Sequence, residues 1–253
     1  MIPTVLSIAG LDPSGGAGIA ADLKTATMMG AYGMAALTTV TVQHPSAVER
    51  VSPLEPELVA AQVQELLQNM PIGAIKIGLV GTNETAQALI GILEDTQIPI
   101  VLDPVTQSSS GQSMSTVDQT TFQRLLIQAT LLTPNRDELA AIFGTETPQE
   151  WVDLNQTAVL CTGGHGPPGP IQCVLWQPQA PQRTWMHKRV QSSQTHGTGC
   201  TLSTAIATQL AKGHGLEEAI ETAIKFTHEL VTRSSQSKLV PNNGPLLHFK
   251  MNG

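Results

Sequence analysis

The sequence lacks the features of a membrane or secreted protein. No uninterrupted apolar stretch approaches the roughly 20 residues that a membrane-spanning helix needs. The beginning of the chain has neither the basic start nor the apolar run of a signal peptide. The three cysteines, Cys161, Cys173 and Cys200, form no C-x-x-C pair, and their odd number does not suit a disulfide framework. We therefore expect a cytoplasmic protein with reduced thiols.

Charged residues are also scarce. They make up 13% of the 253 residues, the net charge is −7, and no cluster of Lys and Arg occurs. This balance argues against nucleic acid or an anionic membrane as a partner. An acidic protein can still bind ATP, because phosphates are held by local backbone N–H groups and Mg²⁺. Hydrophobic residues make up 41% of the chain, enough for a sizeable core, and no linker or internal repeat interrupts it. We expect a single domain over residues 1–253.

Apolar runs alternate with amphipathic segments along the chain. The runs are apolar throughout, which is typical of strands buried on both faces, and the segments between them have helical periodicity. This order predicts an α/β fold, with a mostly parallel central sheet and helices on both faces. In such sheets ligands bind beyond the carboxyl ends of the strands. Strands are expected at about 5–9, 36–42, 74–78, 98–102, 130–132, 157–161 and 171–176, with 183–190 as an edge or hairpin strand.

The segment 195–203 carries the most chemical information. Gly197 and Gly199 let the backbone approach a ligand closely, and a helix is predicted to begin directly after them. The first N–H groups of that helix and its dipole would form an anion hole. Cys200 would lie at the helix N-terminus, where the pKa of a thiol is lowered, and could take the proton from an attacking alcohol. The alternative is a glycine-rich turn before an ordinary core helix, with Cys200 as a small hydrophobic residue.

A second glycine-rich stretch, 10–22, follows the first predicted strand. It has neither G-x-G-x-x-G spacing nor the G-K-[ST] of a P-loop. Asp12 and Asp22 could accept hydrogen bonds from ring amino groups, although Asp22 also suits the first turn of a helix as a simple acidic residue. Gln43, after the second strand, can donate and accept at once, as the edge of an aminopyrimidine requires.

Oxygen ligands follow two later strands. Mg²⁺ takes one or two carboxylates together with phosphate oxygens and waters, which makes Glu138 a candidate, with Asn135 beside it. Asn135 and Glu138 also have the spacing of a capping pair at the start of a helix, and both interpretations can hold. Asp103, before Pro104, is a further candidate metal ligand or else a turn residue.

Taken together, these motifs resemble those of bacterial hydroxymethylpyrimidine/phosphomethylpyrimidine kinases, in the ribokinase-like superfamily. The resemblance covers nearly the whole chain. It rests on segments 8–10, 15–19, 21–25, 30–33, 41–43, 76–78, 103–105, 133–135 with Glu138, 163–165, 196–203 and 244–249.

The resemblance implies a ribokinase-like fold and transfer of phosphate from ATP to 4-amino-5-hydroxymethyl-2-methylpyrimidine and often to its monophosphate. It implies Cys200 as the base and Gly197, Thr198 and Gly199 as the anion hole. Further implied roles are Mg-ATP binding by Asn135, Thr162, Gly164, Glu138 and Asp103, and substrate binding by Gly10, Asp22, Gln43, Leu79 and Val105.

The chain departs from the family pattern at several positions. Leu79 replaces the usual Met, and His44-Pro45 the usual Asn-Thr, while 106–110 is an unusual loop. Thr162 stands where the family often has Lys, and other ribokinase-like kinases resemble this chain at that position. The changes at His44-Pro45 and in the loop bear on substrate choice, so a pyridoxal or pyridoxine kinase is the alternative function. A non-catalytic pyrimidine-binding protein is a second alternative. The resemblance also implies a homodimer.

Overall fold

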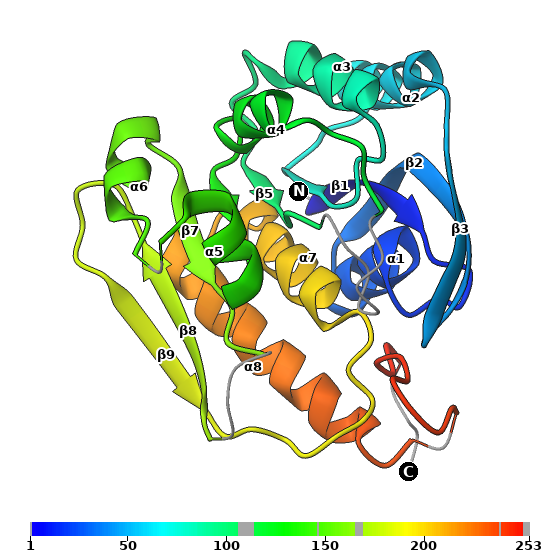
Figure 1. Ribbon diagram of the computed structural model, residues 1–253, viewed down its shortest axis with the longest axis vertical. Helices are drawn as coiled ribbons and strands as arrows, with labels where there is room; N and C mark the ends of the chain where they lie inside the picture. Colours follow the sequence, from blue (N-terminus) through cyan, green and yellow to red (C-terminus); the bar gives the residue numbers. More distant parts are fainter. Residues whose placement is uncertain (1, 106–113, 146, 165–168, 238, 250–253) are drawn as a thin grey trace.

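A sheet of nine strands forms the centre of the protein (Figure 1). The computed structural model describes residues 2–105, 114–145, 147–164, 169–237 and 239–249. The strand order is β3-β2-β1-β4-β5-β6-β7-β8-β9. The strands are β1 (Thr4–Leu11), β2 (Tyr32–His44), β3 (Ala47–Pro53), β4 (Ala74–Ile77), β5 (Ile100–Leu102), β6 (Leu131–Leu132), β7 (Ala158–Cys161), β8 (Ile171–Trp176) and β9 (Arg183–His187).

Helices connect most of these strands, and local sequence sets several of their starts. Pro56 stands at the first position of α2, where its missing N–H is not needed. The side chains of Thr82 and Asp118 accept hydrogen bonds as N-caps of α3 and α4. The helices are α1 (Gly18–Met28), α2 (Pro56–Asn69), α3 (Asn83–Leu93), α4 (Gln119–Leu126), α5 (Arg136–Phe143), α6 (Gln149–Asn155), α7 (Thr198–Ala211) and α8 (Leu216–Ser234).

The centre of the sheet is parallel and its margins are antiparallel. The pairs β1–β2, β1–β4, β4–β5, β5–β6 and β6–β7 are parallel. The pairs β2–β3, β7–β8 and β8–β9 are antiparallel. The prediction of a mostly parallel sheet is confirmed, and β9 is the expected edge strand. Strand β3 and helix α6 were not predicted from the sequence.

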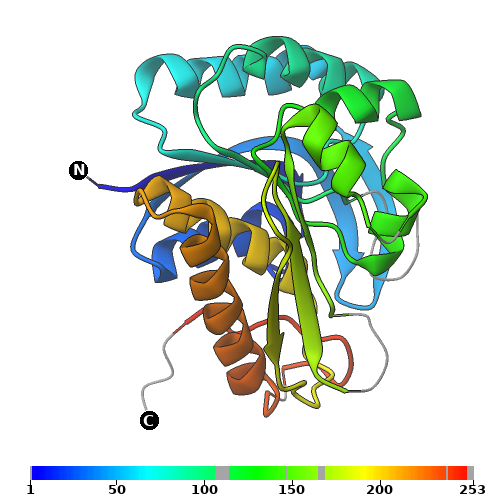
Figure 2. The same ribbon diagram turned by 90° about the vertical axis from the view of Figure 1, so that its left-hand side faces the viewer.

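Two hydrophobic layers cover the two faces of the sheet, as predicted. On β1, Leu6 and Ile8 pack in the layer formed with α2, α3, α4 and α5, while Val5 packs in the layer formed with α1, α7 and α8. This alternation follows from the two-residue period of a strand. Figure 2 shows the cyan helices α2 and α3 on one side of the sheet and the orange helices on the other.

Helix α7 begins within the predicted motif 195–203 and packs on the central sheet. It packs against β1, β4 and β5 near the middle of the sheet, and against α1 and α8. The loop after β1 and Asp103 after β5 lie close to its first residues, because a Cβ on Gly197 would meet Gly16 and a Cβ on Gly199 would lie near Asp103. Among the described residues, no helix combines the length and the apolar character needed to cross a membrane.

Candidate active site

The start of α7 lies against the loop that follows β1. Gly197 is the N-cap of α7 and has a left-handed backbone, with φ of +81°. A Cβ at this position would lie 1.8 Å from the carbonyl oxygen of Gly16, so a side chain cannot fit unless the loop moves. Thr198 and Gly199 form the first two positions of the helix. The structure thus brings together the two glycine-rich segments that were predicted to be functional.

Cys200 is the third residue of α7 and is only partly exposed as a residue. Burial of its thiol raises the pKa of Cys200 to about 12. The positive charge of Lys76 and the backbone N–H of Gly18 act to lower this pKa, whereas the negative charges of Asp103 and Asp22 act to raise it further. The prediction of a lowered pKa is therefore wrong, because the loss of hydration outweighs the favourable position at the helix end. Cys200 is a thiol at neutral pH.

Asp103, directly after β5, faces the first turns of α7. Its Oδ2 accepts a hydrogen bond from Ser203 Oγ at 3.3 Å, and a Cβ on Gly199 would lie 3.7 Å from the same oxygen. Burial raises the pKa of Asp103, and the charge of Asp22 adds to the rise. The charge of Lys76 and hydrogen bonds with Ser203 and Cys200 oppose it. Because Asp103 contacts the first turns of α7, Glu138 remains as the candidate magnesium ligand.

Asp22 and Lys76 form a fully buried ion pair behind the start of α7. Lys76 Nζ lies 2.9 Å from Asp22 Oδ2, and neither side chain is exposed. Ser7 donates to the same oxygen at 2.5 Å, and Thr204 donates to Oδ1 at 2.7 Å. Both oxygens of Asp22 are therefore bound to protein groups. This arrangement gives Asp22 a supporting place behind the site, and its contact with a pyrimidine ring stays a prediction.

The other predicted substrate residues fall into separate pairs. A Cβ on Gly10 would lie 3.1 Å from Leu79 Cδ2, so these two residues are in contact. The N–H of Val105 donates to the carbonyl of Asp103 at 2.7 Å. Gln43 lies near the end of β2, where its Oε1 accepts a hydrogen bond from Thr41 at 3.1 Å. In the part of the chain that the structure describes, no hydrogen bond joins Gln43 to Cys200.

The predicted nucleotide residues Asn135, Glu138 and Thr162 lie together after β6 and β7. Asn135 Oδ1 accepts from the N–H of Glu138 at 2.9 Å, and Glu138 Oε2 accepts from the N–H of Asn135 at 2.8 Å. This is the predicted capping box of α5. Thr162 pairs with Asn135 in an isolated parallel bridge, and its N–H donates to the carbonyl of Pro134 at 2.8 Å.

Glu138 is a partly buried carboxyl group with a raised pKa. Burial, followed by the charge of Asp103, raises the pKa of Glu138 to about 7. Among the described residues, no group of three His, Cys, Asp or Glu side chains could hold a metal ion without other ligands. One carboxylate is, however, what Mg²⁺ uses when phosphate oxygens and waters complete its shell. Glu138 is therefore a suitable ligand for a magnesium ion that binds together with a nucleotide.

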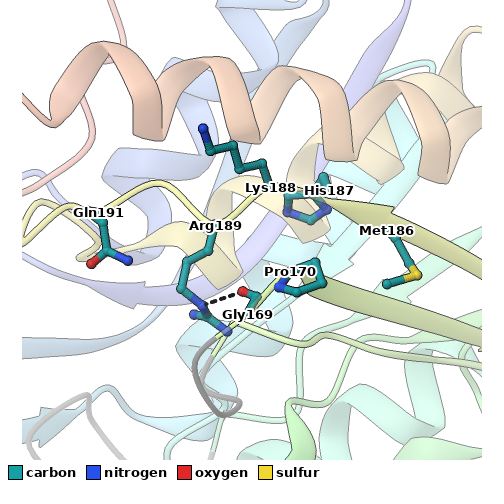
Figure 3. Close-up of a pocket in the computed structure, with 7 residues that line it drawn as sticks. All are labelled: Gly169, Pro170, Met186, His187, Lys188, Arg189 and Gln191. Carbon is teal, nitrogen blue, oxygen red and sulfur yellow. Dashed lines mark hydrogen bonds between the residues drawn. The ribbon is translucent and has the colours of Figure 1, made fainter.

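A pocket of about 490 Å³ lies at the start of β8 and the end of β9 (Figure 3), and Arg189 in its wall contacts the predicted nucleotide residue Gly164. Arg189 connects the two: its Nη1 donates to the carbonyl of Gly164 at 2.7 Å and its Nε to that of Gly169 at 3.2 Å. The predicted neighbour His165 lies outside the described residues. The pocket is lined by Gly169, Pro170, Met186, His187, Lys188, Arg189 and Gln191.

Comparison with known proteins agrees with these features. Residues 12–246 match the family model described as phosphomethylpyrimidine kinase. The chain belongs to the phosphomethylpyrimidine kinase family. It is 34% identical over 243 residues to a hydroxymethylpyrimidine/phosphomethylpyrimidine kinase of Streptomyces coelicolor, covering 91% of this chain and 89% of the relative. The family predicted from the sequence motifs is thus confirmed.

Solved structures of two kinds of kinase resemble this member of the phosphomethylpyrimidine kinase family. An ADP complex of Bacillus subtilis pyridoxal kinase has a TM-score of 0.83 and 28% identity, covering 98% of both chains. Phosphomethylpyrimidine kinase from Clostridium difficile has a TM-score of 0.76 and 30% identity, covering 90% of this chain and 99% of that chain. The ribokinase-like fold is therefore confirmed.

Three features of this phosphomethylpyrimidine kinase family member were missed from the sequence. Lys76 was noted only as part of a motif, and Arg189 only as part of a strand. His196 was assigned no role, yet it binds Asp12 across 184 positions of the chain. The apolar strand around Lys76 was a usable signal, because a lysine in a fully buried strand requires an acidic partner.

Proposed function

We propose that this protein transfers the γ-phosphoryl group of ATP to the hydroxymethyl group of 4-amino-5-hydroxymethyl-2-methylpyrimidine, and also phosphorylates the resulting monophosphate. The observation that carries the proposal is the start of α7. There Cys200 lies in the first turn of α7, beside Asp103, and the backbone N–H of Gly18, the first residue of α1, donates to its sulfur. A helix N-terminus stabilises transferred phosphoryl oxygens, and the sulfur of a cysteine next to it, once deprotonated, is placed to receive the proton of the alcohol.

The transfer can be written with all atoms balanced. The hydroxymethyl oxygen forms a bond to the γ-phosphorus, the bond from that phosphorus to the bridging oxygen breaks, and ADP leaves. The alcohol proton goes to Cys200 Sγ, which must first release its own proton because burial raises the pKa of Cys200 to about 12. Asp103 is the neighbouring acceptor, since burial raises the pKa of its carboxyl and makes it more basic.

Magnesium and the nucleotide would bind on the side of Asn135, Glu138 and Thr162. A bound Mg²⁺ would neutralise charge on the transferred phosphates. The ADP complex of the structurally similar pyridoxal kinase supports ATP as the donor. Thr162 is paired with Asn135 at this place, so the position that often carries Lys in the family adjoins the candidate nucleotide site.

Pyridoxal is a second candidate acceptor, and one observation favours it. The higher of the two TM-scores above is to a pyridoxal kinase, 0.83 against 0.76 for a phosphomethylpyrimidine kinase. Both acceptors carry a hydroxymethyl group on an aromatic nitrogen ring. The family match and the named relatives favour the pyrimidine.

One assay tests these alternatives. The purified protein is incubated with ATP and Mg²⁺ and with either hydroxymethylpyrimidine or pyridoxal, and mono- and diphosphate products are measured. Cys200→Ala is compared with Cys173→Ala, a buried cysteine of β8 outside the site. We expect pyrimidine phosphates from the wild type and from Cys173→Ala, and little product from Cys200→Ala. Preferred phosphorylation of pyridoxal would identify the protein as a pyridoxal kinase. Absence of transfer to both would indicate a binding protein.

A further inference from the structure

Lys76 is a fully buried charged side chain near α7, and the proposed proton transfer from Cys200 to Asp103 gives it no role. We propose that Lys76 is a positioning residue whose fixed positive charge, held by Asp22 beneath the first turns of α7, stabilises negative charge on Cys200 during phosphoryl transfer. This inference rests on the proposed function, because it gives Lys76 a role in that same reaction.

The surrounding backbone fixes where the ammonium lies. Lys76 is 0% exposed in β4, and its Nζ is 2.9 Å from Asp22 Oδ2. A Cβ on Gly78 would lie only 2.7 Å from Nζ, so the ammonium occupies the space left by a glycine at the end of the strand. The charge is therefore directed to the carboxyl end of β4, the edge of the sheet at which α7 begins.

Hydrogen bonds connect this ion pair to the helix that carries Cys200. Thr204 Oγ1 donates to Asp22 Oδ1 at 2.7 Å. Thr204 follows Cys200 by four residues, so the two side chains lie on one face of α7, one turn apart. Lys76, Asp22 and Thr204 thus form a buried chain of contacts that ends one turn from the thiol.

The charge balance also requires a cation at this place. Asp22 and Asp103 are buried carboxylates, and Lys76 is the basic side chain that interacts with both of them and with Cys200. Burial acts to lower the pKa of Lys76, but Asp22, Cys200 and Asp103 together raise it, so the ammonium stays charged. Without it, the thiolate would form next to the buried carboxylate of Asp22 with no positive charge beside it, even though Asp103 has taken up the thiol proton.

A purely structural role for Lys76 is the competing explanation. An ion pair that only neutralises itself can be replaced by uncharged groups with little loss of stability. The double variant Asp22→Asn/Lys76→Met removes both charges and leaves no unpaired ion. A loss of activity in this variant therefore cannot come from an unpaired charge on Asp22. The single variant Lys76→Met would leave that unpaired charge, so it cannot distinguish the structural role of Lys76 from its effect on Cys200.

The experiment compares the wild type, this double variant and Lys225→Met, which removes an exposed lysine of α8. Thermal unfolding, KM for ATP, kcat and the rate of Cys200 alkylation by iodoacetamide are measured, with the alkylated site located by mass spectrometry. If the double variant does not fold, Asp22→Asn/Lys76→Gln repeats the test with two amides that can hydrogen-bond to each other.

We expect the double variant to fold, to keep its KM for ATP and to lose about 100-fold in kcat, as when one preorganised electrostatic group is removed. Cys200 should be alkylated more slowly, and Lys225→Met should match the wild type. A kcat equal to that of the wild type in the double variant would overturn the proposal. If the wild type transfers no phosphate to any acceptor, the proposed function fails; unchanged alkylation in the double variant would then overturn the role of Lys76 separately.

Discussion

His196 Nε2 lies 2.6 Å from Asp12 Oδ2, and this contact ties the loop after β1 to the residue before the N-cap of α7. Both side chains are buried, at 8% and 3% exposure. The absence of a side chain at Gly16 leaves room for the His196 ring, because a Cβ there would lie 2.4 Å from this ring. The geometry of the predicted anion hole therefore depends on a contact between segments that are 184 positions apart in the chain.

Asp12→Asn should destabilise the protein. Burial acts to raise the pKa of Asp12, but hydrogen bonds from His196 and Ser14 outweigh it and lower the pKa from 3.8 to about 2. A carboxyl with a lowered pKa stabilises the fold above pH 4, and this contribution is lost as the pH falls toward 2. We expect a loss of about 2 kcal/mol in unfolding free energy at pH 7, measured with urea, and a smaller difference near pH 3.

A double-mutant cycle with His196→Gln gives the control. The two substitutions should be clearly non-additive, because each removes the same buried contact. Additive effects would show that Asp12 acts through Ser14 and Ala17 alone, whose N–H groups it also binds.

Gly197→Ala should be more damaging than an equivalent change elsewhere. Gly197 and Gly213 both have left-handed backbones, with φ of +81° and +86°. At Gly213 a Cβ would meet nothing within 4 Å, whereas at Gly197 it would meet the carbonyl of Gly16. We expect Gly213→Ala to cost ~1 kcal/mol and Gly197→Ala about 3 kcal/mol or more, with loss of kinase activity only in the latter. Equal melting temperatures of the two variants would contradict this account.

Local signals in the sequence were sufficient for much of the fold. The capping pair Asn135 and Glu138 was predicted from its three-residue spacing and forms as expected. The start of α7 was predicted within one residue, because two glycines precede an apolar helix. Strand β3 was missed because Glu49, Arg50 and Ser52 are exposed and polar; its pairing with β2, and not its composition, makes it a strand.

The site was less accessible to prediction, because its properties depend on contacts between distant segments. Nothing near Cys200 in the sequence indicates that Lys76 and Asp103 lie beside it, so the balance of burial and charge that sets its pKa could not be foreseen. The ion pair of Asp22 and Lys76 spans 54 positions. Hydrophobic pattern fixes which face of a strand is buried, but it does not tell which buried polar groups meet.

Glu138→Gln should make the stability less dependent on pH while lowering activity. Burial and Asp103 raise the pKa of Glu138 from 4.5 to about 7, so between these values the folded protein binds more protons than the unfolded chain. Stability therefore falls as the pH rises through this window. A Gln can still accept the hydrogen bond of Asn135, so the variant should be more stable than the wild type at pH 8 by about 1 kcal/mol.

Urea unfolding at pH 5 and pH 8, together with kcat at saturating Mg-ATP, measures both effects. Activity should fall about tenfold if Glu138 holds the magnesium ion. Glu150→Gln, an exposed first-turn residue of α6, is the matched control and should change neither quantity. The same pH slope in Glu138→Gln and the wild type would refute the buried, proton-binding state of Glu138.

Arg189→Ala should weaken nucleotide binding without slowing the chemical step. The guanidinium holds the carbonyls of Gly164 and Gly169, and so connects the predicted nucleotide segment to the wall of the pocket in Figure 3. Losing this connection would disturb binding equally in the ground state and the transition state, which raises KM and leaves kcat unchanged. We expect the KM for ATP to rise about tenfold, with the KM for the acceptor unaffected.

Arg183→Ala is the control on the same hairpin, because Arg183 contacts Glu217 and the ring of Trp185 and does not line the pocket. A fall in kcat alone, or an equal rise in KM for both arginine variants, would mean that the pocket does not take part in binding the nucleotide.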